Sequence, residues 1–216
     1  TWRLAQTLGY QLLDSGALYR IVGLKAFEAG LITADASQAI DETALLELTQ
    51  SLQIVFEPNS DSGRVDIIVN GAKIGEQVRN ETVGGYASQV AVYPKVRQAL
   101  LKLQQDMATQ SGLVADGRDM GTVVFPDADV KVYLTASATA RAERRVAQLL
   151  KAGQAADFDA ILATIKARDE RDENRATAPS KPAEDALVLD SSNLDADAVY
   201  ELVKKHCQDK GVCFNR

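Results

Sequence analysis

The stretch GLVADGRDMG, residues 112–121, joins an apolar run to a polar turn that contains Asp116, Arg118 and Asp119. A short apolar run of this kind is typical of a strand that is buried on both faces of a parallel sheet. Similar runs occur at YQLLD (10–14), VKVYLT (130–135) and ALVLD (186–190). Helical patterns separate or follow the later runs, at about 137–151, 157–175 and 195–209. This alternation predicts an α/β fold with a parallel sheet and helices on both of its faces.

One part of the chain departs from this alternation. LQIVF (52–56) and RVDIIVNGAKIG (64–75) are typical of antiparallel strands, and Asn70-Gly71 is a tight-hairpin pair. Helical patterns follow at about 80–92 and from Pro94 to about 109. A crossover between parallel strands needs only about a dozen residues. We therefore expect a small antiparallel insertion at about 50–80, and we expect it to close over a ligand.

Composition and charge limit the function classes. The 216 residues suit one large domain or a domain with an insertion, and 46% hydrophobic residues are enough for a core. The net charge of −6 argues against general nucleic-acid binding, which needs a basic surface. No apolar run approaches the roughly 18 residues of a membrane span, and no signal peptide is visible. Cys207 and Cys213 are interpreted as structural or incidental thiols, and a reducing cytoplasm is the expected compartment.

Two of the expected strands end in turns that contain acid, glycine and a polar or basic side chain. These turns are Asp14-Ser15-Gly16 and 116–119, and ligands of parallel sheets bind at the carboxyl ends of the strands. Arg20 follows the first turn by one helical turn and can face the same edge, where Arg118 also lies. Two guanidinium groups at one edge suit a phosphate or a carboxylate. The alternative is that both segments are ordinary turn chemistry.

The octet RDERDENR, residues 168–175, raises a similar choice. With helical periodicity, Arg168, Asp172 and Arg175 continue the apolar stripe of the preceding turns, which is formed by Phe158, Ile161 and Ile165. This placement favours a polar cavity with an anionic ligand, because an unpaired buried charge is expensive. Asp169, Glu170 and Glu173 are then expected to face water. The alternative is a set of exposed ion pairs four residues apart.

The preceding helix adds further positive charge at Arg141, Arg144 and Arg145. Together with Lys166 they predict a mobile basic lid, and Gly153 marks the break between its two helices. A solvated helix surface is the alternative.

Several segments together resemble bacterial cytidylate kinase, a family of nucleoside monophosphate kinases. They are LLDSGALYR, ASQVAVYPKVRQALL, LVADGRDMGTVVFPDADVKVYLTAS, KARDERDENRATAP and ALVLDSS. The resemblance runs from about residue 8 to the final helix. It implies the P-loop nucleotide kinase fold, with a core (1–30, 94–140 and 176–216), a monophosphate-binding insertion (about 31–93) and a helical lid (about 141–175).

The resemblance also implies roles for individual residues. It assigns the monophosphate to Arg20, Arg118 and Arg175, which would be the catalytic arginines. It assigns the cytosine edge to Ser88, Arg97 and Asp119, and the sugar to Ser15, Arg168 and Asp172. The ATP side of the lid would use Arg144, Arg145 and Arg171. A carboxylate at Asp119 would accept from the amine of cytosine and would oppose the carbonyl of uracil.

The implied reaction is transfer of the γ-phosphoryl group of ATP, with Mg²⁺, to CMP or dCMP in pyrimidine metabolism. The resemblance implies no nucleic-acid or membrane partner, and we expect a monomer. One feature departs from the family, because these 216 residues contain no G-x-x-x-x-G-K-[ST] phosphate loop. In the family this loop ends just upstream of the position of Thr1, and we expect that the sequence begins after it. The alternatives are a kinase of the same fold for UMP or AMP, or a catalytically inactive nucleotide-binding module.

Overall fold

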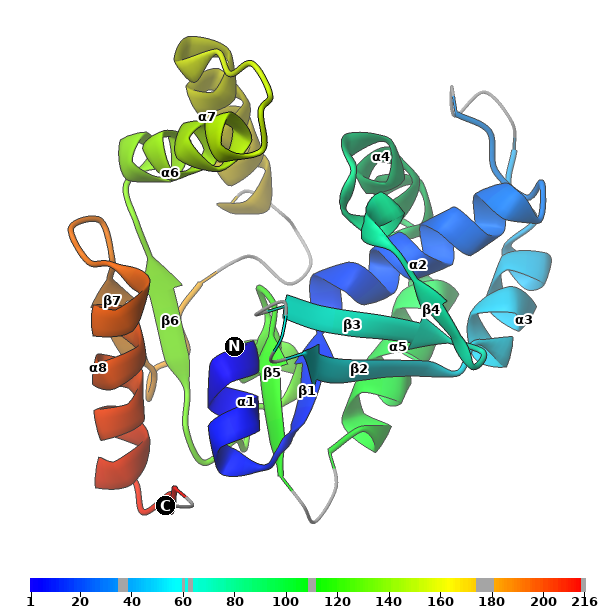
Figure 1. Ribbon diagram of the computed structural model, residues 1–216. Coiled ribbons are helices and arrows are strands. Elements are labelled where there is room, and N and C mark those ends of the chain that lie inside the picture. The colour runs from blue at the N-terminus through cyan, green and yellow to red at the C-terminus, as the bar shows by residue number, and fades with distance from the viewer. Residues whose placement is uncertain (35–38, 60, 62–63, 109–111, 174–180, 215–216) are drawn as a thin grey trace. The chain divides into compact units, whose positions relative to one another are not determined.

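The computed structural model describes residues 1–34, 39–59, 61, 64–108, 112–173 and 181–214, without the side chains of 64, 76, 81, 168 and 171–173 (Figure 1). The chain forms two compact units, Thr1–Gly117 and Arg118–Phe214. Each unit is described by itself. Both mix helices with parallel strands, which confirms the predicted α/β class. The division into core, insertion and lid stays a prediction.

The first unit contains both the β1–β5 parallel pair and the small antiparallel sheet. Its elements are α1 (Trp2–Leu8), β1 (Gln11–Asp14), α2 (Ser15–Glu28), α3 (Glu42–Ser51), β2 (Ile54–Asn59), β3 (Arg64–Val69), β4 (Ala72–Ile74), the 3₁₀ helix η1 (Glu76–Arg79), α4 (Glu81–Val90), α5 (Pro94–Asp106) and β5 (Leu113–Asp116). β1 and β5 pair in parallel, with Asp14 opposite Asp116. This pairing brings the two strand exits that the sequence singled out to one edge.

Local sequence explains where several of these elements begin and end. The side chain of Asp14 accepts a hydrogen bond from the amide of Ala17 and caps α2. β3 and β4 are joined at Asn70 and Gly71, whose φ angles of 51° and 78° suit a tight hairpin. Pro94 occupies the first turn of α5. The predicted hairpin and the predicted start of α5 are thus confirmed.

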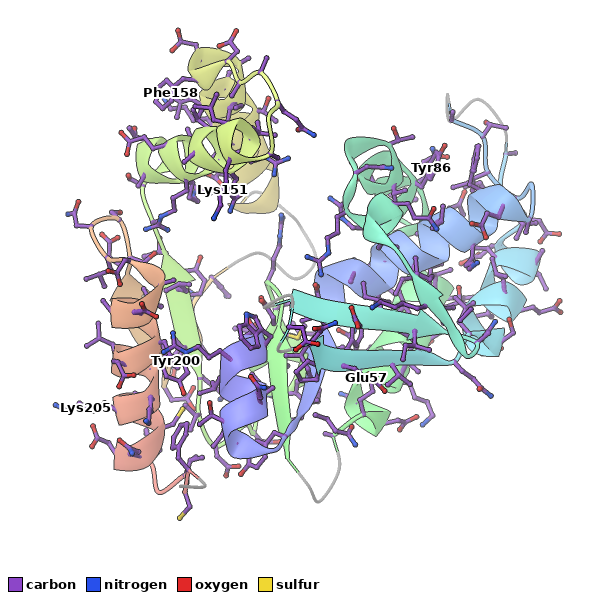
Figure 2. The ribbon with its side chains drawn as sticks, viewed as in Figure 1. Glu57, Tyr86, Lys151, Phe158, Tyr200 and Lys205 are labelled. Atoms are coloured by element: carbon purple, nitrogen blue, oxygen red, sulfur yellow. The ribbon has the colours of Figure 1, made fainter. Side chains whose placement is uncertain are left out.

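Close packing of α2 against α4 forms much of the core of the first unit. A Cβ atom at Gly23 would lie 2.6 Å from the backbone carbon of Tyr86, so only glycine allows this approach. Further along the same interface, the rings of Phe27 and Tyr86 are stacked with centroids 4.5 Å apart. Figure 2 labels Tyr86, which lies on α4. This packing fixes the position of α4 and of the polar residues that it carries.

The second unit contains the π-helix η2, a parallel strand pair and three longer helices. Its elements are η2 (Met120–Val124), β6 (Val132–Thr135), α6 (Ala138–Lys151), α7 (Phe158–Glu173), β7 (Leu187–Asp190) and α8 (Ala196–Asp209). β6 and β7 pair in parallel, as predicted. Gly153, with φ 71°, follows α6 and marks the predicted break before α7.

Burial differs between the two parallel pairs. In β1, Leu12 and Leu13 are fully buried. The predicted burial of β5 on both faces is wrong, because its residues are only half-buried and Asp116 at its end is exposed. In the second unit Leu134 and Val188 are 55% and 56% exposed, so that prediction is wrong for β6 and β7. The alternating burial along β7 means that only one of its faces is covered within the unit.

Within the described residues, no helix combines the length and the apolar character that a membrane crossing requires.

Candidate functional site

A cavity of about 270 Å³ lies in the first unit, where β1 ends and α2 begins. One side consists of residues around the first strand exit, and the other consists of the end of η1. The lining residues are Asp14, Gly16, Ala17, Arg20, Val78 and Arg79. The cavity therefore combines one carboxylate, two guanidinium groups and the first turn of a helix.

Arg20 is held in place by backbone groups of the antiparallel insertion. Its Nη1 donates hydrogen bonds to the carbonyl oxygens of Val78 at 3.2 Å and of Asn80 at 2.8 Å. Its Nη2 would lie only 3.1 Å from a Cβ atom at Gly84, so the absence of a side chain there makes room for the guanidinium. The predicted orientation of Arg20 toward the strand exit agrees with this geometry.

Arg79 is the second arginine of the cavity, and sequence reasoning missed it. Its Nη2 donates to the carbonyl of Val65 at 3.2 Å. The next residue, Asn80, caps α4 by accepting from the amide of Val83 at 2.8 Å. Asn80 could have been recognised in the sequence as the cap of α4. That signal would have placed Arg79 at the end of the segment that leads into this helix.

Asp14 is the carboxylate of this cavity, and its environment opposes ionisation. Burial raises the pKa of Asp14, and the negative charge of Asp116 raises it further. The hydrogen bond from Ala17 and the charges of Arg79 and Arg20 act in the opposite direction. Asp116 is exposed and accepts a hydrogen bond from Thr1 Oγ1 at 2.7 Å. Two neighbouring carboxylates of this kind suit a hard cation.

Three more of the predicted site residues lie in the first unit. Ser15 is buried in the first turn of α2. Ser88 is exposed on α4, and its hydroxyl donates to the carbonyl of Gly84 at 3.1 Å. Arg97 on α5 is half-buried, and its guanidinium carbon lies 6.0 Å from the ring centroid of Tyr19. Arg20 and Ser88 therefore both contact Gly84. The guanidinium of Arg20 lies beside the position of the missing side chain, and the hydroxyl of Ser88 donates to the Gly84 carbonyl.

Arg118 and Asp119 begin the second unit, and both are half-buried. The carbonyl of Asp119 accepts hydrogen bonds from the amides of Val123 at 2.9 Å and Val124 at 3.2 Å. The bond from Val124 spans five residues and closes a π-helical turn of η2. Short π-helical segments are frequent at functional sites.

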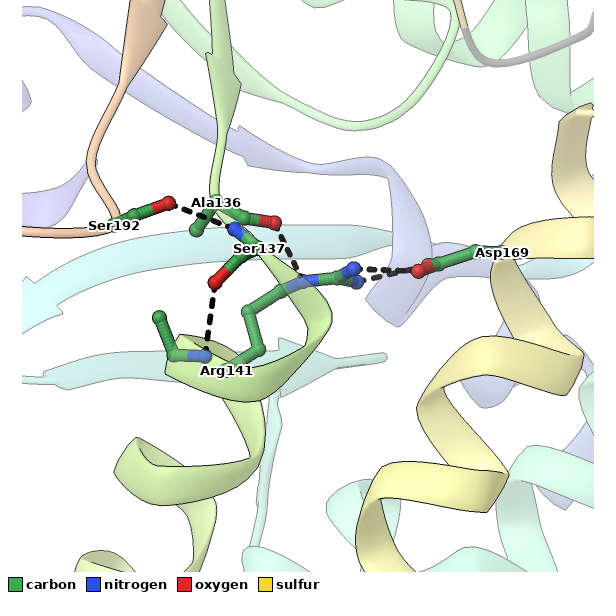
Figure 3. A network of polar contacts seen from close by, with 6 residues as sticks. Ala136, Ser137, Arg141, Asp169 and Ser192 are labelled. Carbon is green, nitrogen blue, oxygen red and sulfur yellow. Dashed lines mark hydrogen bonds and ion pairs between the residues drawn. The ribbon is translucent and has the colours of Figure 1, made fainter.

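The helices of the expected lid are joined by an ion pair that sequence reasoning did not foresee (Figure 3). The two terminal guanidinium nitrogens of Arg141 on α6 donate to the carboxylate of Asp169 on α7, at 2.8 and 2.5 Å. Arg141 Nε also donates to the carbonyl of Ala136, where β6 leads into α6. The expectation that Asp169 faces water is therefore wrong, because Arg141 offers it a fork of two donors.

The structure describes the side chains of some of the remaining lid residues and not those of others. Arg144 donates to the carbonyls of Ser191 and Leu194 in the loop that follows β7. Arg145 is exposed on α6. The other predicted residues have side chains outside the described part of the chain or lie outside it altogether, namely Arg168, Arg171 and Asp172 on α7, and Arg175.

Comparison with known proteins places this chain among nucleotide kinases. The family model for cytidylate kinase matches residues 1–209. The chain is 52% identical to the cytidylate kinase of Pasteurella multocida over 207 residues, which cover 96% of this chain and 88% of that protein. It is 48% identical to cytidylate kinase 1 of Haemophilus influenzae, with 99% and 89% of the two chains covered. The cytidylate kinase of Actinobacillus succinogenes is 49% identical, with 97% and 92% covered. The chain belongs to the cytidylate kinase family.

Proposed function

We propose that this chain transfers the γ-phosphoryl group of ATP to CMP or dCMP, giving CDP or dCDP and ADP. Membership of the cytidylate kinase family is the observation that carries the proposal, because the match spans residues 1–209. Phosphoryl transfer of this kind depends on positioning and electrostatics rather than on a covalent intermediate.

Arginines would hold the acceptor phosphate beside the γ-phosphorus. An oxygen of the acceptor phosphate attacks, the bond to the β–γ bridging oxygen breaks, and ADP leaves with that electron pair. Arg20, Arg118 and Arg175 would bind the monophosphate and stabilise the charge of the transition state. The cavity beside Arg20 supports this role, since a second guanidinium and a helix start adjoin it.

Three side chains would read the base, and their chemistry fits cytosine. Asp119 would accept from the exocyclic amine, while Arg97 would donate to the carbonyl and ring-nitrogen acceptors. Ser88 would add a hydroxyl contact from α4. Ser15, Arg168 and Asp172 would bind the sugar, and Arg144, Arg145 and Arg171 would lie on the ATP side of the lid.

A divalent cation, Mg²⁺, would accompany ATP. Asp14 and Asp116 are opposite one another on neighbouring strands, and the pKa of Asp14 is raised by burial and by the charge of Asp116. A cation between them would relieve both effects. Mg²⁺ keeps several water and phosphate ligands, so one or two carboxylates would be enough to hold it. When bound, Mg²⁺ would partly neutralise the charge of the donor phosphates.

We further propose that the enzyme acts as a monomer in the cytoplasm. All the residues assigned here come from one chain, so the site needs no second copy. Cys207 and Cys213 are free thiols, which suits a reducing compartment.

An acceptor panel tests the proposed function. The full-length protein is assayed for ADP formation from ATP with CMP, dCMP, UMP and AMP as acceptors. We expect kcat/KM to be highest for the two cytidine nucleotides. Equal values for CMP and UMP would refute the preference for cytosine. Calorimetry in the absence of ATP measures CMP binding separately, and binding without turnover would indicate an inactive nucleotide-binding module.

A further inference from the structure

A lysine that the sequence analysis did not single out lies against η2, close to Gly121. Lys131 directly precedes β6, and its side chain is only 9% exposed. Its Nζ donates to the two carboxylate oxygens of Asp185, at 2.9 and 2.8 Å, and to the carbonyl of Pro126. The ammonium is therefore both paired and hydrogen-bonded, at the end of a side chain that is largely covered.

The aliphatic part of Lys131 also lies against η2. A Cβ atom at Gly121 would come within 3.2 Å of its Cδ and 3.4 Å of its Cγ. Gly121 therefore leaves room for the lysine side chain, whose ammonium reaches Pro126 beyond the end of η2. One side chain thus contacts the segment 121–126 near both of its ends.

This segment determines where Asp119 lies. The amides of Val123 and Val124 donate to the carbonyl of Asp119, and the amide of Phe125 donates to the carbonyl of Met120 at 2.7 Å. A displacement of residues 121–126 would be transmitted to Asp119 through these hydrogen bonds. Binding groups must be held within about 0.5 Å of their working geometry to discriminate between ligands.

We propose that Lys131, paired with Asp185, is a positioning residue that holds Asp119 in place for recognition of the cytosine amine. The proposal rests on the proposed function, because it assumes that Asp119 reads the base. Lys131 acts through Asp119, so its removal lowers the preference for CMP over UMP. A general structural role would instead reduce the rates with both acceptors equally.

Two substitutions and one control test this role. Lys131→Met keeps the length of the side chain and removes the ammonium. Asp185→Ala removes its partner at a carboxylate that is 60% exposed, so folding is expected to survive. Lys102→Met is the control, because it removes an exposed lysine paired with Asp106 at 2.7 Å on α5. The readouts are kcat/KM for CMP and for UMP, and hydrogen exchange at the amides of Val123 and Val124.

We expect Lys131→Met to lower the CMP-to-UMP ratio of kcat/KM about tenfold. Asp185→Ala should shift the ratio in the same direction by less, the control should keep it, and amide exchange should accelerate in the two variants alone. An unchanged ratio in folded Asp185→Ala or Lys131→Met would overturn the positioning role, as would an equal loss with both acceptors. If the unsubstituted protein already treats CMP and UMP alike, the proposed preference for cytosine fails instead.

Discussion

Arg79 shows how a single side chain can complete a binding cavity without belonging to a recognisable motif. Arg20 donates two hydrogen bonds to backbone carbonyls, so only some of its N–H groups remain for a ligand. Arg79 lines the same cavity from η1 and makes one such bond, to Val65. A guanidinium has five N–H donors, so donors remain for an anion. We therefore expect Arg79 to contact the acceptor phosphate together with Arg20.

Substitution of Arg79 by Gln should weaken acceptor binding more than it slows turnover. Hydrogen bonds to charged groups contribute about 1.5–3 kcal/mol, so we expect the KM for CMP to rise about tenfold or more. Initial-rate kinetics with varied CMP at saturating ATP measure the effect. Lys73→Gln is the matched control, because it removes an exposed positive charge from β4, in the same small sheet. Equal changes in the two variants would show that Arg79 acts only through the general field of the insertion.

At the scale of elements, the contact between α2 and α4 connects the core to the candidate site. Gly23 permits the close approach, and Gly84 on α4 accommodates Arg20. Gly23 is therefore needed for steric reasons, and Gly84 avoids a tight contact with the guanidinium of Arg20. The helical pattern at about 80–92 predicted α4 from sequence. It did not reveal which faces touch, because a glycine contributes no apolar side chain to the pattern.

A pair of substitutions separates this steric requirement from helix propensity. In Gly23→Ala, the new Cβ atom would meet backbone atoms of Tyr86 and Ala87 at 2.6 and 2.7 Å, so α4 must shift. Overpacking of this kind costs about 1–3 kcal/mol. In Gly85→Ala nothing lies within 4 Å, and the gain in helix propensity is up to about 1 kcal/mol. Urea unfolding should show opposite changes in the free energy of unfolding, and equal changes would mean that α2 and α4 can separate without loss.

The strands, the hairpin and most helix boundaries could be predicted because each has a local cause in the sequence. Apolar runs form β1, β5, β6 and β7, and the pair Asn70-Gly71 forms the hairpin. The π-helix η2 and the ion pair of Arg141 with Asp169 could not be predicted in this way. η2 has no distinctive hydrophobic period, and the ion pair joins residues 28 positions apart whose proximity depends on how α6 and α7 pack.

The candidate site residues can also be divided into those with a local signal in the sequence and those without one. Arg20 and Asp119 stand at strand exits, where the topology of parallel strands concentrates ligand-binding groups. Ser88 had no local signal and came only from the resemblance, since its hydroxyl bonds to its own helix. Arg79 and Lys131 act through contacts with distant segments, which a single sequence does not reveal.

At the scale of the whole molecule, Asp14 lowers the stability of the fold when it is ionised, although we expect the ionised form to be needed for function. Its pKa is raised above the ordinary value of 3.8, chiefly by burial. The folded state therefore binds more protons than the unfolded state between 3.8 and the raised pKa, so stability falls as the pH rises through this window. At neutral pH the ionised carboxylate is a destabilising group. A carboxylate that lowers stability in this way is expected to serve a ligand, here the cation that accompanies ATP.

Asp14→Asn should therefore make the protein more stable and less active. The amide oxygen of Asn can still cap α2, because Asn and Asp are about equally good caps. We expect a higher melting temperature at pH 7.5 and a smaller difference near pH 3, below the ordinary pKa of 3.8, where Asp14 is largely protonated in both states. Turnover should fall, and half-maximal activity should require more Mg²⁺. Scanning calorimetry at both pH values and a magnesium titration of the rate measure these effects.

Asp195→Asn is the matched control for this experiment. Asp195 caps α8 in the same way, through a 2.8 Å hydrogen bond from the amide of Ala198. Its substitution should leave the melting temperature and the magnesium dependence nearly unchanged at either pH. Asp14→Asn with full activity would remove Asp14 from the cation site. If Asp14→Asn brings no gain in stability at pH 7.5, the cavity already solvates the ionised carboxylate as well as water does. The carboxylate of Asp14 would then not need a ligand to explain it.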